Sequence, residues 1–271
     1  TVSSGLDQAV VWLDVLLVGL LAGSSAAGIY GGASRFIQVG LVVDAAIRVV
    51  VSPRFSALLH RGDLKAVQDL YRVAATWLVT MATPLYLALA IFAPVALGIL
   101  GPEFVEGELA LIVLCGGAIV TFLAGNIHSV LLMSGRSGWA AINKTVVVVL
   151  NVIGNLLLVP RLGITGAAIA WVICMVIDAT LALVQVRRFT GLRAEPAQVL
   201  LPVTLTIATV GSACLGARMV LGPTWSGLIV GCTIGGLVYA GACVLLRRNL
   251  HLDGLVGAFL NRTGARLGDS S

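Results

Sequence analysis

Charged residues are scarce in this sequence. Asp, Glu, Lys and Arg make up 11% of its 271 residues, whereas an ordinary globular protein contains about 25%. Hydrophobic residues make up 59%, above the roughly 45–50% that is typical of soluble domains. A water-soluble fold needs more polar surface than this composition supplies. The composition therefore excludes a cytosolic enzyme, a disordered chain and a secreted disulfide scaffold, and it predicts a polytopic membrane protein.

The sequence also lacks the motifs of soluble enzymes and of metal sites. It contains no GxxxxGK loop, no HExxH pair and no Ser/His/Asp set at credible spacing. None of its five cysteines forms a CxxC pair, so neither a zinc site nor a disulfide framework is predicted. The net charge of +5 comes from short connectors between apolar runs, which indicates membrane topology rather than nucleic-acid binding. We therefore expect neither an enzyme, nor a metal site, nor a nucleic-acid partner.

Eight apolar runs are long enough to cross a membrane as helices. A spanning helix takes about 20 apolar residues, and runs of this length exceed a barrel strand and lack its period-two alternation. The sequence therefore predicts an all-α membrane bundle of about eight transmembrane helices. The runs cover residues 6–22, 28–51, 74–100, 109–133, 139–159, 165–186, 196–217 and 224–246.

The basic residues predict the orientation of these spans. With both ends of the chain in the cytoplasm, the inner connectors and the tail hold thirteen Lys and Arg residues, Lys144 among them, against Arg161 and Arg218 outside. This asymmetry is typical of the positive-inside rule. We expect a bacterial cytoplasmic membrane protein with both termini of this chain inside. Because the chain begins with Thr1 rather than Met, we expect it to be part of a longer protein.

Glycines in the last run follow a helical period. Gly227, Gly231 and Gly235 are each four residues apart and would therefore line one side of the helix. Small residues in this pattern let two membrane helices approach closely. We predict a close helix contact along this face.

Four ionisable side chains fall deep inside the predicted spans: Asp14, Arg35, Asp44 and Asp178, with Arg48 near the inner boundary. Each charge at the middle of a membrane costs roughly 2.5–3.5 kcal/mol on insertion scales. Unpaired, the set would cost on the order of 10–15 kcal/mol, which is comparable to the whole stability of a domain. We expect these side chains to face protein or a water-filled cavity, and to pair with one another.

The depths of these residues suggest two layers. At about 1.5 Å per residue, Asp14 and Arg35 lie roughly 10–14 Å below the outer surface, and Asp44 and Asp178 about 20–24 Å below it. For Asp44 and Arg48, four residues apart, a structural helix-surface pair is favoured over a functional role. For Arg35 a function is favoured, because a guanidinium at this depth suits bidentate phosphate binding.

One further group of polar residues lies inside a predicted span. His128 and Asn126 both fall within the run 109–133. Hydrogen bonding within the bundle is favoured for them over a ligand role.

The order of motifs along the chain resembles a known family. The motifs are Asp14–Gly19, Gly28–Arg35, Ser52–Phe55, Gly62-Asp63 and the stretch Asn151–Ala170 with its Asn-x-x-x-Asn and Gly-Ala-Ala elements. They resemble the second half of a polysaccharide or O-antigen flippase of the multidrug/oligosaccharidyl-lipid/polysaccharide exporter superfamily, over about Asp14–Arg188. The stretch Asn151–Ala170 is the most specific part of this resemblance.

The resemblance implies an architecture. Members have two six-helix lobes that work by alternating access, and they carry polyprenyl-pyrophosphate-linked glycans to the outer leaflet. Residues 1–190 would be the second lobe, residues 191–247 the two additional helices of fourteen-helix members, and residues 248–271 a cytoplasmic tail. The first lobe, or a partner chain in its place, would complete the transporter, with membrane lipids around it.

The resemblance also implies roles for individual residues. Arg35 falls on the position of a cavity arginine thought to hold pyrophosphate in lipid II flippases, and Ser34 replaces the acid that precedes it there. This difference favours the polysaccharide branch. Asp14 would hold Arg35 while the site is empty, and Asp44 or Asp178 would take a coupling proton or Na⁺.

Two other functions remain open from the sequence. A cation-coupled drug or metabolite exporter of the same superfamily would depend on the acids more than on Arg35. A non-transporting membrane scaffold would be indifferent to Arg35, and the basic segment 54–72 could dock its partner or anionic lipid.

Overall fold

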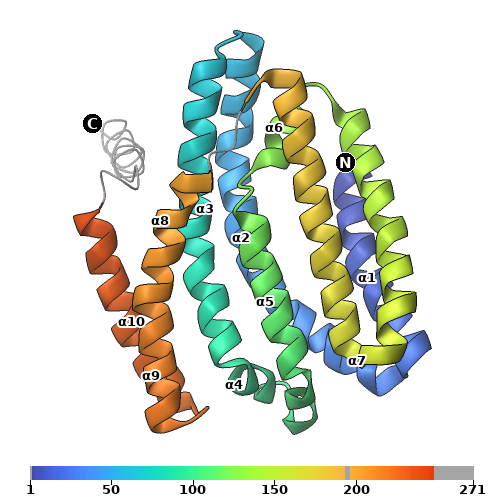
Figure 1. The fold of residues 1–271 in the computed structure, drawn as a ribbon, viewed down its shortest axis with the longest axis vertical. Helices are drawn as coiled ribbons and strands as arrows, with labels where there is room; N and C mark the ends of the chain where they lie inside the picture. The colour runs from blue at the N-terminus through green and yellow to red at the C-terminus, as the bar shows by residue number, and fades with distance from the viewer. Residues whose placement is uncertain (1, 193–195, 247–271) are drawn as a thin grey trace, which may run out of the picture.

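The computed structural model describes residues 2–192 and 196–246, with the side chains of residues 2–11 and 196–198 left undescribed. Every regular element in these described ranges is a helix (Figure 1). The predicted tail at 248–271 lies outside the described residues. The elements are α1 (Val2–Ala22), α2 (Ser24–His60), α3 (Leu64–Ile91), α4 (Ala93–Gly98), η1 (Pro102–Gly107), α5 (Glu108–Phe122), α6 (Ile127–Met133), α7 (Ser137–Thr190), α8 (Pro196–Thr206), the π-helical η2 (Ile207–Gly211), α9 (Ser212–Leu221) and α10 (Trp225–Leu245).

The predicted all-α membrane bundle is confirmed. Within the described chain, six helical segments are long and apolar enough to cross a membrane, and Trp12–Ala22 of α1 is a shorter apolar helix. The longest segment, α7, consists of two helices that meet at Gly163, whose φ of 58° and ψ of −140° are not helical. Figure 1 shows α7 turning back on itself at this point. With the two arms of α7 counted separately and α1 included, these segments number eight, and each overlaps one of the eight predicted runs.

The basic segment between the second and third runs differs from the prediction. It was expected to be a connector, but α2 continues to His60 and α3 begins at Leu64, so only a three-residue turn separates them. Asp63 caps α3 by accepting a hydrogen bond from the Ala66 backbone nitrogen at 3.0 Å. Hydropathy marks where an apolar run ends, whereas a helix continues as long as its backbone hydrogen bonds do. The basic side chains here extend from helices.

The predicted span 109–133 is broken in its middle. α5 ends at Phe122 and α6 begins at Ile127. Between them Gly125 has φ +56°, and a Cβ there would lie 2.6 Å from the Cβ of Ala75 on α3. The Tyr71 hydroxyl donates a 2.6 Å hydrogen bond to the Ala124 carbonyl. Non-helical backbone at membrane depth needs such partners because lipid supplies none.

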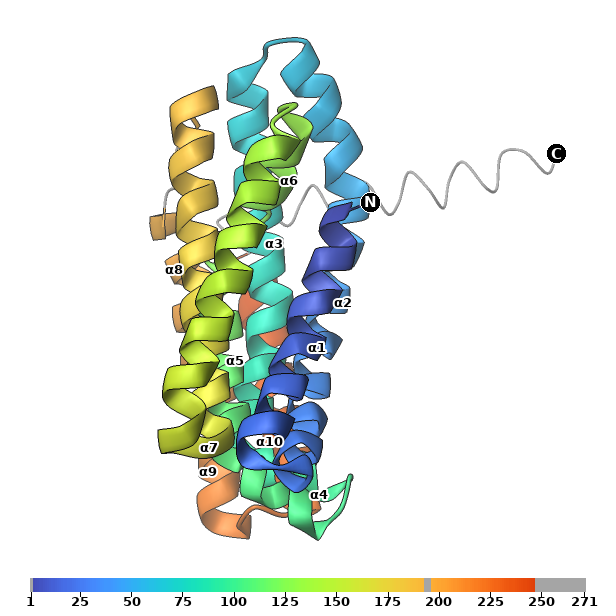
Figure 2. The same ribbon diagram turned by 90° about the vertical axis from the view of Figure 1, so that its right-hand side faces the viewer.

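The helices run along the long axis of the molecule in both views (Figures 1 and 2). α1 packs against α2 and α7, and α5 packs against α7, α3 and α2. α6 packs against α7 and α2. α8 and η2 lie along α3, and α10 lies along α9 and η2. α7 ends at the left-handed Gly191. The division of the chain at residue 190 into a lobe and two additional helices stays a prediction.

The predicted glycine contact is confirmed. α10 buries three residues along its fully described length, and all three are glycines: Gly227, Gly231 and Gly235. A Cβ on Gly231 would lie 3.0 Å from the Cys214 Cα, and a Cβ on Gly235 would lie 3.0 Å from the Val210 Cα. The backbones of α10 and of α9 with η2 therefore touch along this seam.

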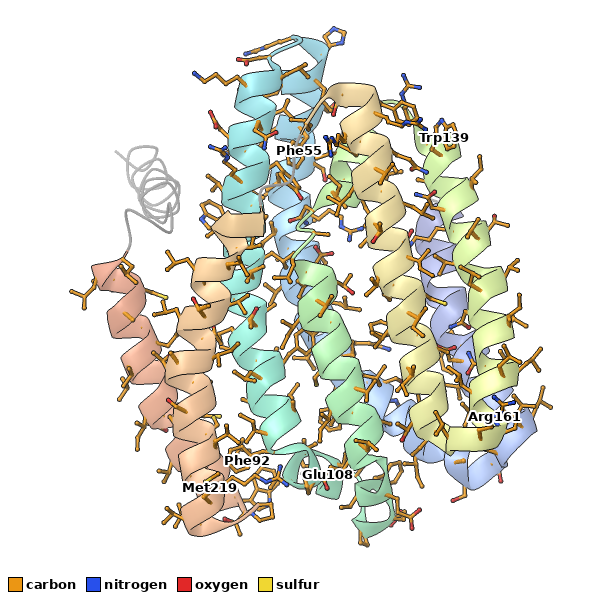
Figure 3. The ribbon with its side chains drawn as sticks, in the orientation of Figure 1. Phe55, Phe92, Glu108, Trp139, Arg161 and Met219 are labelled. Carbon is orange, nitrogen blue, oxygen red and sulfur yellow. The ribbon has the colours of Figure 1, made fainter. Side chains whose placement is uncertain are left out.

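The two ends of the bundle carry different connectors. Figure 3 shows Glu108, Arg161 and Met219 at one end, and Phe55 and Trp139 toward the other. The predicted outer connectors thus meet at one end. There the Arg218 guanidinium lies 3.1 Å from a Glu108 carboxylate oxygen, and it also donates to the Ile91 carbonyl. This ion pair joins α9 to the start of α5.

Candidate functional site

Asp14 lies in the interface between α1 and α7. The side chain is 1% exposed. One carboxylate oxygen accepts a 2.9 Å hydrogen bond from the Asn155 side chain, and the other faces the Tyr30 hydroxyl at 3.4 Å. The expectation that Asp14 holds Arg35 is therefore wrong for this structure. Depth along a helix gives the height of a side chain, but the neighbour it meets depends on helix rotation, and here Asp14 faces α7.

Arg35 lines a separate cavity of about 620 Å³. Its side chain is exposed, and Ser34 and Gln38 share the cavity wall with it. Trp12 and Phe104 supply apolar wall beside these polar groups. Among the side chains that the structure describes, no acid lines this cavity and none forms an ion pair with Arg35. The guanidinium is available to an anion.

A second cavity of about 250 Å³ lies where α2, the break between α5 and α6, and both arms of α7 meet. We call it the Asp178 cavity. On its α2 side, Asp44 accepts a hydrogen bond from Arg48 at 2.5 Å, which confirms the predicted helix-surface pair. The other Asp44 oxygen accepts a 2.9 Å hydrogen bond from Asn126 at the helix break. The break therefore brings an amide group to a buried carboxylate.

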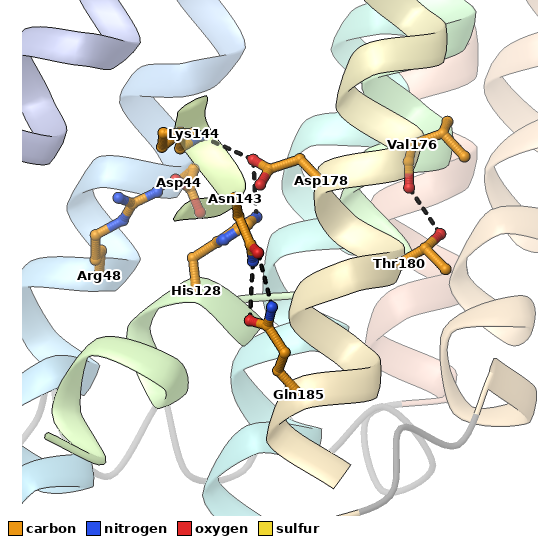
Figure 4. A network of polar contacts seen from close by, with 9 residues as sticks. All are labelled: Asp44, Arg48, His128, Asn143, Lys144, Val176, Asp178, Thr180 and Gln185. Atoms are coloured by element: carbon orange, nitrogen blue, oxygen red, sulfur yellow. Dashed lines mark hydrogen bonds and ion pairs between the residues drawn. The ribbon is translucent and has the colours of Figure 1, made fainter. Parts of the chain in front are cut away.

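On the α7 side of this cavity, two basic side chains point at Asp178 (Figure 4). The Lys144 ammonium lies 2.8 Å from an Asp178 oxygen, and His128 Nε2 lies 3.6 Å from the same oxygen. Beside this pair, Asn143 and Gln185 exchange two hydrogen bonds of 2.9 and 2.7 Å between the arms of α7. These contacts join the two arms of α7, and the contact of His128 with Asp178 joins α6 to them.

Lys144 is one functional-site residue that the sequence reasoning missed, and Ser129 and Trp171 are others. Lys144 was assigned to an inner connector, yet it lies in α7, and its side chain is 14% exposed. The signal was its position five residues inside the run that begins at residue 139. A lysine at that place is too deep for a loop and needs an acidic partner.

A small cavity of about 30 Å³ lies between the other two. It shares Ser34 and Gln38 with the Arg35 cavity, and Leu41 and Trp171 with the Asp178 cavity. Ser34, Gln38, Leu41, Asp44 and Arg48 are spaced three or four residues apart, so they follow one face of α2. From Arg35 to Arg48 this face extends about 20 Å at 1.5 Å per residue. Polar groups thus line a path along α2.

Within the part of the chain that the structure describes, no group of three or more His, Cys, Asp or Glu side chains could hold a metal ion. The arrangement supplies instead a cation open to an anion at one end of the path and two charge-paired acids at the other. Such a path suits a polar ligand that carries a negative charge at one end.

Comparisons with known proteins point to the class of transporter that the motifs predicted. No family model matches the chain. It is 24% identical over 189 residues to a Haloferax volcanii protein named "Probable low-salt glycan biosynthesis flippase Agl15", which covers 69% of this chain and 40% of that protein. It is 24% identical over 176 residues to "Probable flippase AglR" of the same organism, over 63% of this chain and 37% of that protein. The chain thus spans about two fifths of these relatives. These names support the resemblance predicted from the motifs, and the chain is similar to flippase-type transporters of polysaccharide or oligosaccharide.

Proposed function

We propose that this chain is the C-terminal part of a flippase that moves a polyprenyl-pyrophosphate-linked oligosaccharide across the cytoplasmic membrane. The observation that carries the proposal is Arg35, an exposed guanidinium in a 620 Å³ cavity with no acid among the described residues of its wall. The similarity to proteins named as flippases supports it.

Arg35 would hold the pyrophosphate. A guanidinium presents two parallel N–H donors to a phosphate and keeps its charge in a membrane-embedded cavity. A bare diphosphate in hydrocarbon would leave both its charge and its acceptors unsatisfied. Trp12, Leu100 and Phe104 line the same cavity, so a prenyl chain leaving the phosphate would meet an apolar surface. Beyond this apolar wall, the rest of the prenyl chain would lie in the lipid.

The coupling ion, in this proposal, is a proton. Asp44 and Asp178 are the acids expected to take it, and each already has a basic partner, Arg48 and Lys144 respectively. Na⁺ would need several oxygen ligands at once, and a guanidinium or an ammonium already contacts one oxygen of each carboxylate, whereas a proton needs a single oxygen. The pairing also favours a flippase over a cation exporter, because an organic cation would meet acids that are already neutralised.

The remaining parts of the transporter are proposed from the relatives. Because they are more than twice as long as the matched region, we propose that a second lobe faces this one and completes the translocation path. The end of the bundle that carries Phe55 and Trp139 would face the cytoplasm (Figure 3), and the end with Glu108 and Arg161 the outside.

Replacement of Arg35 tests the proposed function. Arg35→Lys in the native membrane protein that contains this chain should abolish flipping of lipid-linked oligosaccharide, because an ammonium lacks the planar pair of donors. The measurement is outer-leaflet exposure of the glycan in reconstituted vesicles. Arg61→Lys, at the exposed end of α2, is the control and should transport normally. Full transport by Arg35→Lys contradicts the proposal, and indifference to Arg35→Ala as well indicates the scaffold.

A further inference from the structure

The Asp178 cavity contains buried acceptors that have no hydrogen-bond donor. Within the described chain, Asp178 Oδ1, Asn126 Oδ1 and Ser129 Oγ are buried and have no hydrogen-bond partner. Their residues are 2%, 3% and 2% exposed, and all three line this cavity. Buried polar atoms are nearly always satisfied in native proteins. Three such oxygens around one space indicate a ligand that brings several donors.

The charges around the cavity indicate that this ligand is neutral. Asp44 is paired with Arg48, and Asp178 is paired with Lys144. With both pairs ionised, these four charges sum to zero. His128 lies at the same Asp178 oxygen as Lys144 and changes this balance only when it is protonated. A free anion would prefer Arg35, which has no ion pair among the described residues, and a cation would have to displace a basic side chain.

The rest of the wall favours a ring with apolar faces. Trp171 lines the cavity together with Leu132 and Met175. The Asp178 cavity has a volume of about 250 Å³, just below the range of about 300–1,000 Å³ that is usual for pockets of drug-sized ligands. The cavity therefore suits one small ring. A sugar combines hydroxyl donors around its rim with C–H faces that pack on an aromatic ring. Carboxylate and amide oxygens are acceptors for those hydroxyls.

We infer that the Asp178 cavity binds one sugar residue of the lipid-linked glycan, held by Asp178, Asn126 and Ser129 and packed on Trp171. This inference rests on the proposed function and deepens it. From Arg35 to Asp44 the chain of α2 rises about 14 Å, and the cavities between them share Leu41 and Trp171. The two sites therefore lie along one face of α2 with a small cavity of about 30 Å³ between them, and a glycan attached to a pyrophosphate on Arg35 would extend along this face toward the Asp178 cavity.

Two probes separate the sugar subsite from the phosphate site. One is polyprenyl pyrophosphate without sugar, and the other is the lipid-linked oligosaccharide fraction extracted from the host's own membranes. Binding of each to the complete native protein is measured by native mass spectrometry from detergent micelles, because this readout does not depend on the tryptophans that are replaced. The wild-type protein should bind the glycosylated lipid roughly tenfold or more tightly than the bare one, as expected if the cavity adds one or two kcal/mol of affinity.

Variants of the cavity should remove this preference alone. Trp171→Ala should weaken binding of the glycosylated lipid roughly tenfold, and Ser129→Ala about two- to fivefold, the usual effect of one hydrogen bond. Both should leave binding of the bare lipid unchanged. Trp171→Phe should keep the preference, because it retains an aromatic face. Trp139→Ala, which removes an exposed tryptophan outside the cavity, is the matched control.

The outcomes distinguish the two proposals. Equal binding of both probes by the wild type, or an equal loss of both in Trp171→Ala, overturns the sugar subsite and leaves the flippase proposal standing. If the wild type binds neither probe, the proposed function itself is contradicted. If Trp171→Ala does not fold, Ser129→Ala and Trp171→Phe decide the question, because both are small changes. A Ser129→Ala protein with an undiminished preference overturns the hydrogen-bonding part of the subsite. A Trp171→Phe protein that has lost the preference overturns the packing on an aromatic face.

Discussion

The bundle of α1–α7 and the helices α8–α10 are held together by different means. The bundle encloses charged and amide side chains, among them Asp14, Asn155, Asp178 and Lys144. α10 instead buries only its three glycines, and a small apolar cluster around Phe92 and Cys214 lies where α9 meets α3 and α4. The first region depends on partners for polar groups, and the second depends on backbones that fit closely.

This difference has a physical reason in membranes. Lipid tails are as apolar as the side chains of a helix, so helices gain little from burying apolar surface against each other. They associate through close packing or through polar contacts. Close packing along a glycine seam needs no particular partner chemistry and leaves no cavity. Polar contacts leave room for a ligand, as the Asp178 cavity shows. Binding is therefore expected in the bundle and not in the seam.

The largest effect is expected when one member of the buried ion pair is removed. Lys144→Met leaves the Asp178 carboxylate without its ammonium, and loss of one partner of a buried pair costs about 3–5 kcal/mol. The free energy of unfolding, from a denaturant titration in detergent micelles, should fall by about this amount. The remaining basic neighbour is His128, whose Nε2 lies 3.6 Å from the carboxylate oxygen, farther than the 2.8 Å contact that is lost.

Two further proteins sharpen this prediction. The double variant Lys144→Met/Asp178→Leu should be more stable than Lys144→Met alone, because it leaves no buried charge unpaired. Lys65→Met, which changes an exposed lysine on α3, should be within about 0.5 kcal/mol of the wild type. A Lys144→Met protein as stable as the Lys65→Met protein would contradict the polar description of the bundle.

A smaller effect is expected in the seam. Gly235→Leu places a side chain against the backbone of Val210, 3.0 Å from where its Cβ would lie. Overpacking of this kind costs about 1–3 kcal/mol, and it should move α10 away from α9. Cys214, which is fully buried, should then react faster with a membrane-permeant thiol reagent. Gly236→Leu is the matched control, because a Cβ there meets nothing within 4 Å. Equal reactivity of Cys214 in the two variants would contradict the seam.

The smallest effect is expected at the ion pair between α9 and α5. The side chains of Arg218 and Glu108 are 32% and 34% exposed, and exposed pairs contribute about 0–1 kcal/mol. Arg218→Gln should lower the stability by no more than this, and Glu106→Gln, an exposed acid in the same connector, should leave it unchanged. A loss of stability from Arg218→Gln that exceeds the loss from Gly235→Leu would show that this pair, and not the seam, holds the additional helices.

The sequence predicted those features that depend on neighbours along one helix. The spans follow from apolar length, the Asp44–Arg48 pair from a spacing of four, and the seam from glycines four residues apart. Features that depend on how one helix is turned toward another were predicted wrongly or missed. Asp14 meets Asn155 rather than Arg35, and Lys144 meets Asp178 across the two arms of α7.

By itself, the sequence determined that the chain is a helical membrane bundle, where its spans lie, and that several charges must be satisfied inside it. Only the tertiary structure decided which charges meet, that a span breaks at Gly125, and that three cavities follow one face of α2. The physical reason is the distance along the chain over which each property is determined. Hydropathy and helical periodicity are local properties of the chain, whereas an ion pair or a cavity depends on the rotation and spacing of helices far apart in sequence.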